Sequence, residues 1–210
     1  MLKYQSIPVT AFQQNCSLVW CDQTNKAAFI DPGGDAEQLI KAVERYNVTL
    51  ESILLTHGHL DHVGASKTLS SQFDVPIIGP HKNETIWFDN LPQQAQMFNL
   101  PHIEPFLPDQ WLNEDETTQV GNLTFRVLQT PGHTPGHIIF FEENNKTAFV
   151  GDVLFKGSIG RTDFPQGDHD ELIHSIKTKL LPLGDDVTIV PGHGPTSTLG
   201  LERISNPYLK

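Results

Sequence analysis

Short apolar runs separated by turn residues make up most of the first third of the chain. Residues 36–46 (AEQLIKAVERY) place Leu39, Ile40, Val43 and Tyr46 at helical spacing, directly after the Gly-rich turn DPGG. We therefore expect a helix there, and a second helix from about residue 64 to 73. Buried strands are predicted from apolar runs at 16–20 (CSLVW), 26–31 (KAAFID), 51–56 (ESILLT) and 75–80 (VPIIGP).

The same pattern of apolar runs and turns returns after residue 116. Strands are predicted at 123–130 (LTFRVLQT), 137–143 (HIIFFEE), 146–152 (KTAFVGD) and 186–194 (DVTIVPGHG), and a helix at 170–181 (DELIHSIKTKLL). The segment 81–116 is rich in Pro, Gln, Asn and Asp, and we expect one helix and a long loop there. Two sets of strands, each accompanied by helices, predict an α/β fold of two packed sheets with helices on the outer faces.

Four of the predicted strands each deliver a histidine or an aspartate at their C-terminal end. These residues, mostly beside a glycine, are His57, His133, Asp152 and His193. Sites in layered α/β folds are built at such strand ends, on loops that a rigid scaffold positions. We therefore expect the four side chains to meet at one place.

The heptapeptide THGHLDH, residues 56–62, concentrates further donors at the first of these strand ends. His57 and His59 are two residues apart, so in an extended segment they point the same way and can chelate one ion. Asp61 and His62 follow where a helix is about to begin, face differently, and are candidates for a second ion. Without a cation, neutral imidazoles crowded against carboxylates would be costly to desolvate.

The chain has more potential metal ligands than a single ion can bind. Seven donors are available, more than one four-coordinate zinc can use: His57, His59, Asp61, His62, His133, Asp152 and His193. Two ions that share a bridging carboxylate fit this inventory, at the ~3.5–4 Å separation typical of two-metal hydrolytic sites. We expect His81, His102, His169 and His174 to be solvated surface residues, and His137 to be either a support behind the donors or a packed strand residue.

Length, charge and cysteine usage narrow the class of protein. The 210 residues suit one domain, and the net charge of −11 argues against nucleic acid as a partner. No run approaches the ~20 apolar residues that cross a bilayer, and no export signal is visible at the N-terminus. Cys16 and Cys21 are expected to be buried free thiols in a reducing cytosol, which predicts a cytoplasmic protein without membrane contact.

The motifs together resemble the metallo-β-lactamase superfamily. THGHLDH, the later PGHTPGH at 131–137, the GD pair at 151–152 and PGHG at 191–194 carry the resemblance, which extends from Asp31 to His193. It implies an αββα sandwich with mixed sheets, formed as a single domain by residues 1–210. It also implies a first metal on His57, His59 and His133, a second on Asp61, His62 and His193, and Asp152 as the bridge. Asp31 would support the ligands from behind, although DPGG is equally compatible with a plain strand-ending turn.

Within the superfamily, residues 151–168 (GDVLFKGSIGRTDFPQGD) resemble the glyoxalase II-like branch, the hydroxyacylglutathione hydrolases. This resemblance implies hydrolysis of thioesters such as S-D-lactoylglutathione, and hence a role in methylglyoxal detoxification. The C-terminal helical domain of larger glyoxalase II enzymes is expected to be missing, since the chain ends soon after His193. The substrate would be a small acyl thioester, and the protein a monomer or a small homo-oligomer.

The implied mechanism is attack on the thioester carbonyl by a hydroxide that bridges the two ions, because metal binding lowers the pKa of water toward ~7. Asp61 and Asp152 are the expected catalytic carboxylates. Arg161 occupies the place of a basic residue that contacts glutathione in the branch, and Lys156 is a second candidate substrate contact. The alternative for Arg161 is an ion pair with Asp163 that orders the loop.

Several alternatives accompany this hypothesis. The same histidine motif and a similar GRTDF loop occur in mononuclear iron persulfide dioxygenases, and a hydrolase of another ester or lactone, or a non-enzymatic metal-binding protein, would carry the same donors. Antibiotic-hydrolysing members are expected to resemble the chain poorly, because they commonly carry a cysteine where this chain has Asp152. As cofactors we expect two divalent metal ions, zinc first, since histidine with carboxylate suits iron and manganese as well.

Overall fold

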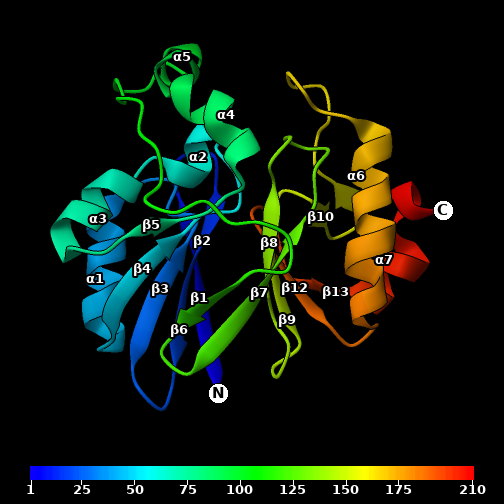
Figure 1. Ribbon diagram of the computed structural model, residues 1–210, viewed down its shortest axis with the longest axis horizontal. Helices are drawn as coiled ribbons and strands as arrows, with labels where there is room; N and C mark the ends of the chain where they lie inside the picture. The colour runs from blue at the N-terminus through cyan, green and yellow to red at the C-terminus, as the bar shows by residue number, and fades with distance from the viewer.

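The computed structural model describes residues 1–210 as two β-sheets packed face to face, with helices on both outer faces (Figure 1). The first sheet has the strand order β1-β2-β3-β4-β5. Its strands are β1 Leu2–Val9, β2 Gln14–Cys21, β3 Lys26–Ile30, β4 Thr49–Leu54 and β5 Ile77–Ile78. It is mixed, since β1, β2 and β3 pair antiparallel whereas β3, β4 and β5 pair parallel.

The second sheet has the strand order β13-β12-β9-β8-β7-β6. Its strands are β6 Thr117–Val120, β7 Leu123–Gln129, β8 Ile138–Glu142, β9 Thr147–Gly151, β12 Thr188–Pro191 and β13 Ser197–Thr198. All its pairings are antiparallel except that of β12 with β9, which is parallel. A separate small hairpin joins β10 Leu154–Phe155 to β11 Ser158–Ile159.

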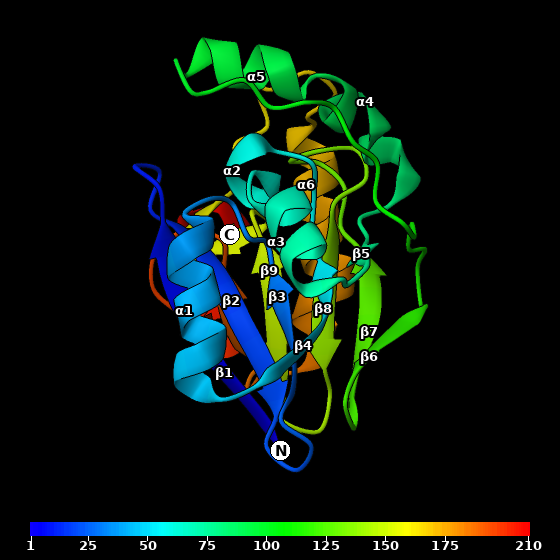
Figure 2. The same ribbon diagram turned by 90° about the vertical axis from the view of Figure 1, so that its left-hand side faces the viewer.

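The helices form the two outer layers and close one end of the sandwich. α1 Ala36–Tyr46 and α3 Ser66–Phe73 cover the first sheet (Figure 2), whereas α6 His169–Ser175 and α7 Leu199–Ser205 cover the second. α2 Leu60–Val63, α4 Thr85–Asp89 and α5 Leu91–Met97 lie at the end that is uppermost in Figure 1. α6 continues as a π-helical turn, Ile176–Leu180, and 3₁₀ turns occur at Lys82–Glu84, Leu181–Leu183 and Pro207–Leu209. No helix has the length and apolar character needed to cross a membrane.

The central strands of each sheet are buried on both faces, which explains why they are continuous apolar runs. In β3, Ala27 and Phe29 pack in the outer core against α1 and α3, while Ala28 and Ile30 point into the core between the sheets. In β8, Phe140 points into that central core and Phe141 into the core beneath α6. Apolar side chains are thus required at successive positions rather than at alternate ones.

The predicted α/β sandwich is confirmed, with the central strands and the helix at residues 36–46 in their predicted places. Segment 81–116 contains two short helices, α4 and α5, where one was predicted. β1, β6, β13, the β10–β11 hairpin and α7 were not predicted. β1 is an edge strand whose exposed positions are polar and which contains Pro8, so its sequence lacks the apolar run of a central strand.

The central core between the sheets supplies a test of this architecture. Phe140→Ala should lower the free energy of unfolding by about 3–5 kcal/mol, because the fully buried ring leaves a cavity between two rigid sheets. Ile204→Ala, on the solvent side of α7 and 78% exposed, should change it by no more than about 0.5 kcal/mol. Urea unfolding of both variants measures the difference, and equal losses would contradict the layer assignment.

Candidate metal centre

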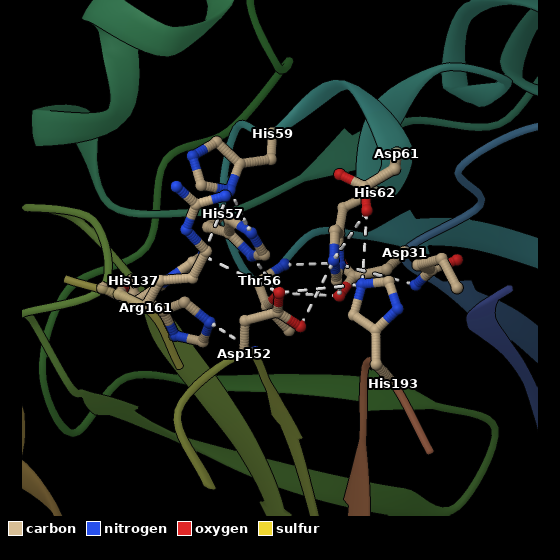
Figure 3. Close-up of polar contacts among 12 residues, drawn as sticks. Asp31, Thr56, His57, His59, Asp61, His62, His137, Asp152, Arg161 and His193 are labelled. Atoms are coloured by element: carbon tan, nitrogen blue, oxygen red, sulfur yellow. Dashed lines mark hydrogen bonds and ion pairs between the residues drawn. The ribbon is translucent and has the colours of Figure 1, made fainter. Parts of the chain in front are cut away.

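The loops after four strands bring their histidines and aspartates to one end of the sandwich (Figure 3). β4 leads to His57, β7 to His133, β9 to Asp152 and β12 to His193, as their spacing after the strands predicts. His59, Asp61 and His62 lie on the turn between β4 and α2 and within α2 itself. The structure therefore brings together all seven donors identified in the sequence.

Three imidazole nitrogens form the first group. Nδ1 of His59 lies 3.1 Å from Nε2 of His57 and 3.1 Å from Nε2 of His133. Two nitrogens bound to one tetrahedral zinc at 2.0–2.1 Å would be about 3.3 Å apart, so the observed spacing fits one shared ion. All three side chains are buried, and these atoms converge on one point.

The other ring nitrogens of His57 and His133 have partners that fix where the protons lie. Nδ1 of His133 is 2.7 Å from the carbonyl oxygen of Arg161, which can only accept a hydrogen bond, so this nitrogen donates. The Thr56 hydroxyl donates to Asp31 at 2.6 Å and therefore accepts from Nδ1 of His57, 3.0 Å away. The Nε2 lone pairs of His57 and His133 are consequently free to bind a cation.

The second group consists of Asp61, His62 and His193. Nε2 of His193 lies 3.2 Å from Oδ2 of Asp61, and Nε2 of His62 lies 3.9 Å from the same oxygen. Asp152 stands between the two groups (Figure 3), with Oδ1 3.4 Å from Nε2 of His62 and Oδ2 3.7 Å from Nε2 of His133. One carboxylate thus reaches both groups, as a bridging ligand must.

The two groups differ in their electrostatics. Burial, reinforced by the neighbouring imidazoles, lowers the pKa of His57 well below its usual value and that of His59 to about 3. Burial also lowers the pKa of His62, but the charges of Asp152 and Asp61 outweigh it and hold this pKa well above normal. The first group therefore presents neutral nitrogens, and the second attracts positive charge.

Asp31 has a larger role than a strand-ending turn requires. It is buried at the end of β3, and it accepts hydrogen bonds from the backbone N–H of Thr56 at 2.8 Å and from Nδ1 of His62 at 2.9 Å. Nδ1 of His62 must donate, since the carboxylate only accepts, and its Nε2 is then directed toward Asp61 and Asp152. Asp31, His57 and His62 lie close enough together to form a third possible metal site. The hydrogen bonds of Asp31 explain this closeness, so no third ion is needed.

The donor set fits two divalent cations. Nε2 of His62 and Oδ1 of Asp152 are buried without a hydrogen-bond partner, a state that is costly unless something else satisfies them. Neutral imidazoles with carboxylates are the ligands that zinc, iron and manganese accept. One ion in each group would bind both the buried atoms that lack a hydrogen-bond partner and the converging lone pairs of the imidazoles.

Access to the centre is from the side of the second group. The side chains of His193 and Asp61 are 31% and 22% exposed, whereas those of His57 and His62 are fully buried. The other side is closed by aromatic rings. Trp87 and Phe164 lie edge-on to His59, with ring centroids at 4.4 and 4.9 Å.

Several supporting residues had no identified signal in the sequence. Trp87 lies far from the motifs in the chain, whereas Phe164 lies in the 151–168 segment and Thr56 in THGHLDH, but neither was given a role. Glu84, in the segment that the sequence left unexplained, is a buried carboxylate bonded to the donor loops, and its pKa is raised by burial to about 7. His137, whose role was open, accepts at Nε2 from the backbone N–H of Asp152 at 3.1 Å and stacks on His57, so it supports the donors.

The two candidate substrate contacts lie on the loop after Asp152. Arg161 is exposed and forms a bidentate pair with Asp163 at 2.8 and 2.7 Å, with its guanidinium 4.2 Å from the ring centroid of Phe164. Lys156 is exposed at the tip of the β10–β11 hairpin. Neither side chain forms a hydrogen bond or an ion pair with any of the seven donors.

Comparison with known proteins places this geometry in a family. A model of the metallo-β-lactamase superfamily matches residues 9–193. The chain is 55% identical over 209 residues to a Haemophilus influenzae protein named hydroxyacylglutathione hydrolase GloC, which covers 99% of this chain and 98% of that protein. The aligned region therefore spans the positions of all the donors and the loop that carries Arg161.

Two solved structures are also similar over nearly their whole length. TTHA1623 in a di-iron-bound form has a TM-score of 0.89 and 36% identity, covering 98% of this chain and 100% of that one. The BLEG-1 B3 metallo-β-lactamase has a TM-score of 0.90 and 38% identity, covering 100% and 99%. The expectation that antibiotic-hydrolysing members resemble this chain poorly is therefore wrong, because this neighbour matches the chain over its whole length. On the family match and on the 55% identity to its relative, the chain belongs to the metallo-β-lactamase superfamily.

Proposed function

We propose that the protein is a metal-dependent thioester hydrolase of the hydroxyacylglutathione hydrolase type, with S-D-lactoylglutathione as its first candidate substrate. The observation that carries this proposal is the 55% identity, over almost the entire chain, to the Haemophilus influenzae protein of that name. The geometry supports it, because the donors form two adjacent groups with one shared carboxylate.

The metals are proposed to be two divalent ions. His57, His59 and His133 would hold one, Asp61, His62 and His193 the other, and Asp152 both. Zinc is the first candidate metal for a set of imidazoles and carboxylates. Iron is the second candidate metal, because the similar structure of TTHA1623 is in a di-iron-bound form.

Each part of the site would contribute to hydrolysis in a definite way. Two bound ions supply Lewis acidity toward the thioester carbonyl and lower the pKa of water to about 7. Asp61, on the open side, can accept a hydrogen bond from the attacking water and orient it. Trp87 and Phe164 keep solvent from the His59 side. The departing thiolate needs little acid assistance, since an ordinary thiol has a pKa of about 8.5.

Arg161 is proposed to contact the acidic part of the substrate. An arginine has five N–H donors, and the pair with Asp163 uses two of them, so the others remain available. Asp163 then holds the guanidinium in one orientation instead of competing with the substrate. Lys156, at the hairpin tip, is the second proposed contact.

A lactam is the second candidate substrate, favoured by the similarity to the B3 enzyme BLEG-1. A mononuclear iron dioxygenase would leave the second group of donors without a role, although Asp61, His62 and His193 also lie close enough together to hold an ion. The buried, unpaired Cys16 and Cys21 suit a reducing cytoplasm, which we propose as the location.

Metal loading combined with substrate assays tests the proposal. Protein stripped with a chelator and reloaded with zinc should bind two ions per chain and hydrolyse S-D-lactoylglutathione, and stripping should abolish the activity reversibly. If the protein binds one iron per chain and consumes oxygen with a persulfide as substrate, it is a dioxygenase and not a hydrolase. Faster turnover of a β-lactam than of any thioester would favour the second candidate.

Asp152→Ala should remove metal and activity together, because it deletes the carboxylate whose oxygens face Nε2 of both His62 and His133. Metal affinity should fall by more than about 100-fold, because losing a residue that only supports a ligand already lowers metal affinity by up to about 100-fold. The control Asp186→Asn alters an exposed carboxylate paired with Lys146 and should leave both properties unchanged. An Asp152→Ala protein that keeps two ions and full activity would rule out the bridge.

The two roles considered for Arg161 differ in their substrate dependence. Arg161→Ala should raise KM for lactoylglutathione by about five-fold, the factor expected for an exposed charge pair, with kcat unchanged. Asp163→Ala should raise it less, and neither variant should affect a thioester of a neutral thiol. Equal effects on both substrates would instead indicate that the pair only orders the loop.

A further inference from the structure

Glu84 is a buried carboxylate that the catalytic proposal does not use. It ends the 3₁₀ turn Lys82–Glu84, is 0% exposed, and forms no ion pair with any basic side chain. A buried charge without a cationic partner is costly, and such groups persist where other interactions compensate them. Its surroundings show what these interactions are.

The two oxygens of Glu84 bond to the two loops that carry the first group of donors. Oε2 accepts from the backbone N–H of Gly58 at 2.8 Å, and Gly58 lies between His57 and His59. Oε1 accepts from the backbone N–H of Gly136 at 2.7 Å, in the loop that begins near His133. A single side chain therefore joins the loops that supply all three converging nitrogens.

The backbone around Glu84 packs directly on both loops. A Cβ atom at Gly58 would lie 2.7 Å from Cβ of Trp87, and one at Gly136 would lie 2.8 Å from the backbone nitrogen of Glu84. Both distances are too short for any residue but glycine. On α5, Gln94 adds a second bond, since its Oε1 accepts from the backbone N–H of Leu60 at 2.9 Å.

We propose that Glu84 is a positioning residue for the first metal ion: its carboxylate holds the His57–His59 turn and the His133 loop at the separation that the ion needs. A divalent ion held by the histidines on either side of Gly58, and by His133 three residues before Gly136, also compensates the buried negative charge. The inference rests on the proposed metal centre. It adds a residue that touches neither ion nor substrate and acts through the donor loops.

Replacement by glutamine separates this role from simple packing. Glutamine has nearly the same shape, but it replaces one acceptor oxygen by an NH₂ donor that would face a backbone N–H. One of the two loops must then lose its bond. The affinity for the first ion should fall while the second ion, held by Asp61, His62 and His193, is retained.

Zinc titration of the stripped full-length chain against a competing chelator measures the two affinities. His59→Ala and His193→Ala identify which binding step belongs to which group. Glu84→Gln should weaken the first site by ten- to a hundred-fold, the range for partners that orient ligands, and leave the second within about three-fold. The matched control is Glu142→Gln, another buried carboxylate that accepts a backbone N–H, from Asn145 at 2.7 Å, in the turn after β8; both affinities should stay unchanged.

A folded Glu84→Gln protein with wild-type zinc affinities would overturn the proposal, as would an equal loss in Glu142→Gln. A second measurement needs no variant. Removing zinc from the wild-type protein should speed hydrogen exchange at the amides of Gly58 and Gly136 and leave that of Asn145 unchanged. Unaltered exchange at both glycines would also overturn it.

These outcomes are distinct from a failure of the proposed function. A wild-type protein that binds two zinc ions but cleaves no thioester would disprove the hydrolase and leave the role of Glu84 intact. Wild-type zinc affinity in Glu84→Gln would disprove the role of Glu84 and leave the proposed hydrolase intact.

Discussion

The crowding of imidazole nitrogens and carboxylate oxygens at one end of the sandwich is the constraint on which the rest of the structure depends. Nδ1 of His59 lies 3.1 Å from two other imidazole nitrogens whose lone pairs point at it, and Oδ1 of Asp152 is buried without a partner. Desolvated groups of this kind are stable together when cations lie among them. The site is therefore best understood as a pair of cation sites that the two sheets hold ready.

The surrounding fold fixes the direction of each donor from behind. Asp31 orients His62 directly and His57 through Thr56, while the carbonyl of Arg161 orients His133. The donors themselves come from both sheets, because His57, His59 and His62 follow β4 of the first sheet whereas His133, Asp152 and His193 follow strands of the second, so the site is assembled only when the two sheets have packed. The same packing leaves the Asp61 and His193 side open, so the first group is buried whereas solvent reaches the second.

The sequence was informative where chemistry and local structure coincide. Apolar runs that end in glycine and a histidine or aspartate predicted both the strands and the meeting of His57, His133, Asp152 and His193, because sites in layered α/β folds form where strands end. It was uninformative where a contact is purely tertiary. Glu84 lies in a segment without periodicity, and its partners are backbone N–H groups of glycines far along the chain, which no spacing reveals. The interpretation of Asp31 as part of a plain turn underestimated it for the same reason, since its partners come from the loop after β4 and from α2.

The central claim is that one carboxylate, Asp152, joins two cation sites, and anomalous diffraction from crystals of the zinc-loaded protein tests it most directly. The account predicts two peaks about 3.5–4 Å apart. One should contact His57, His59 and His133, the other Asp61, His62 and His193, and Asp152 should contact both. A single peak, or two peaks of which only one contacts Asp152, would contradict it.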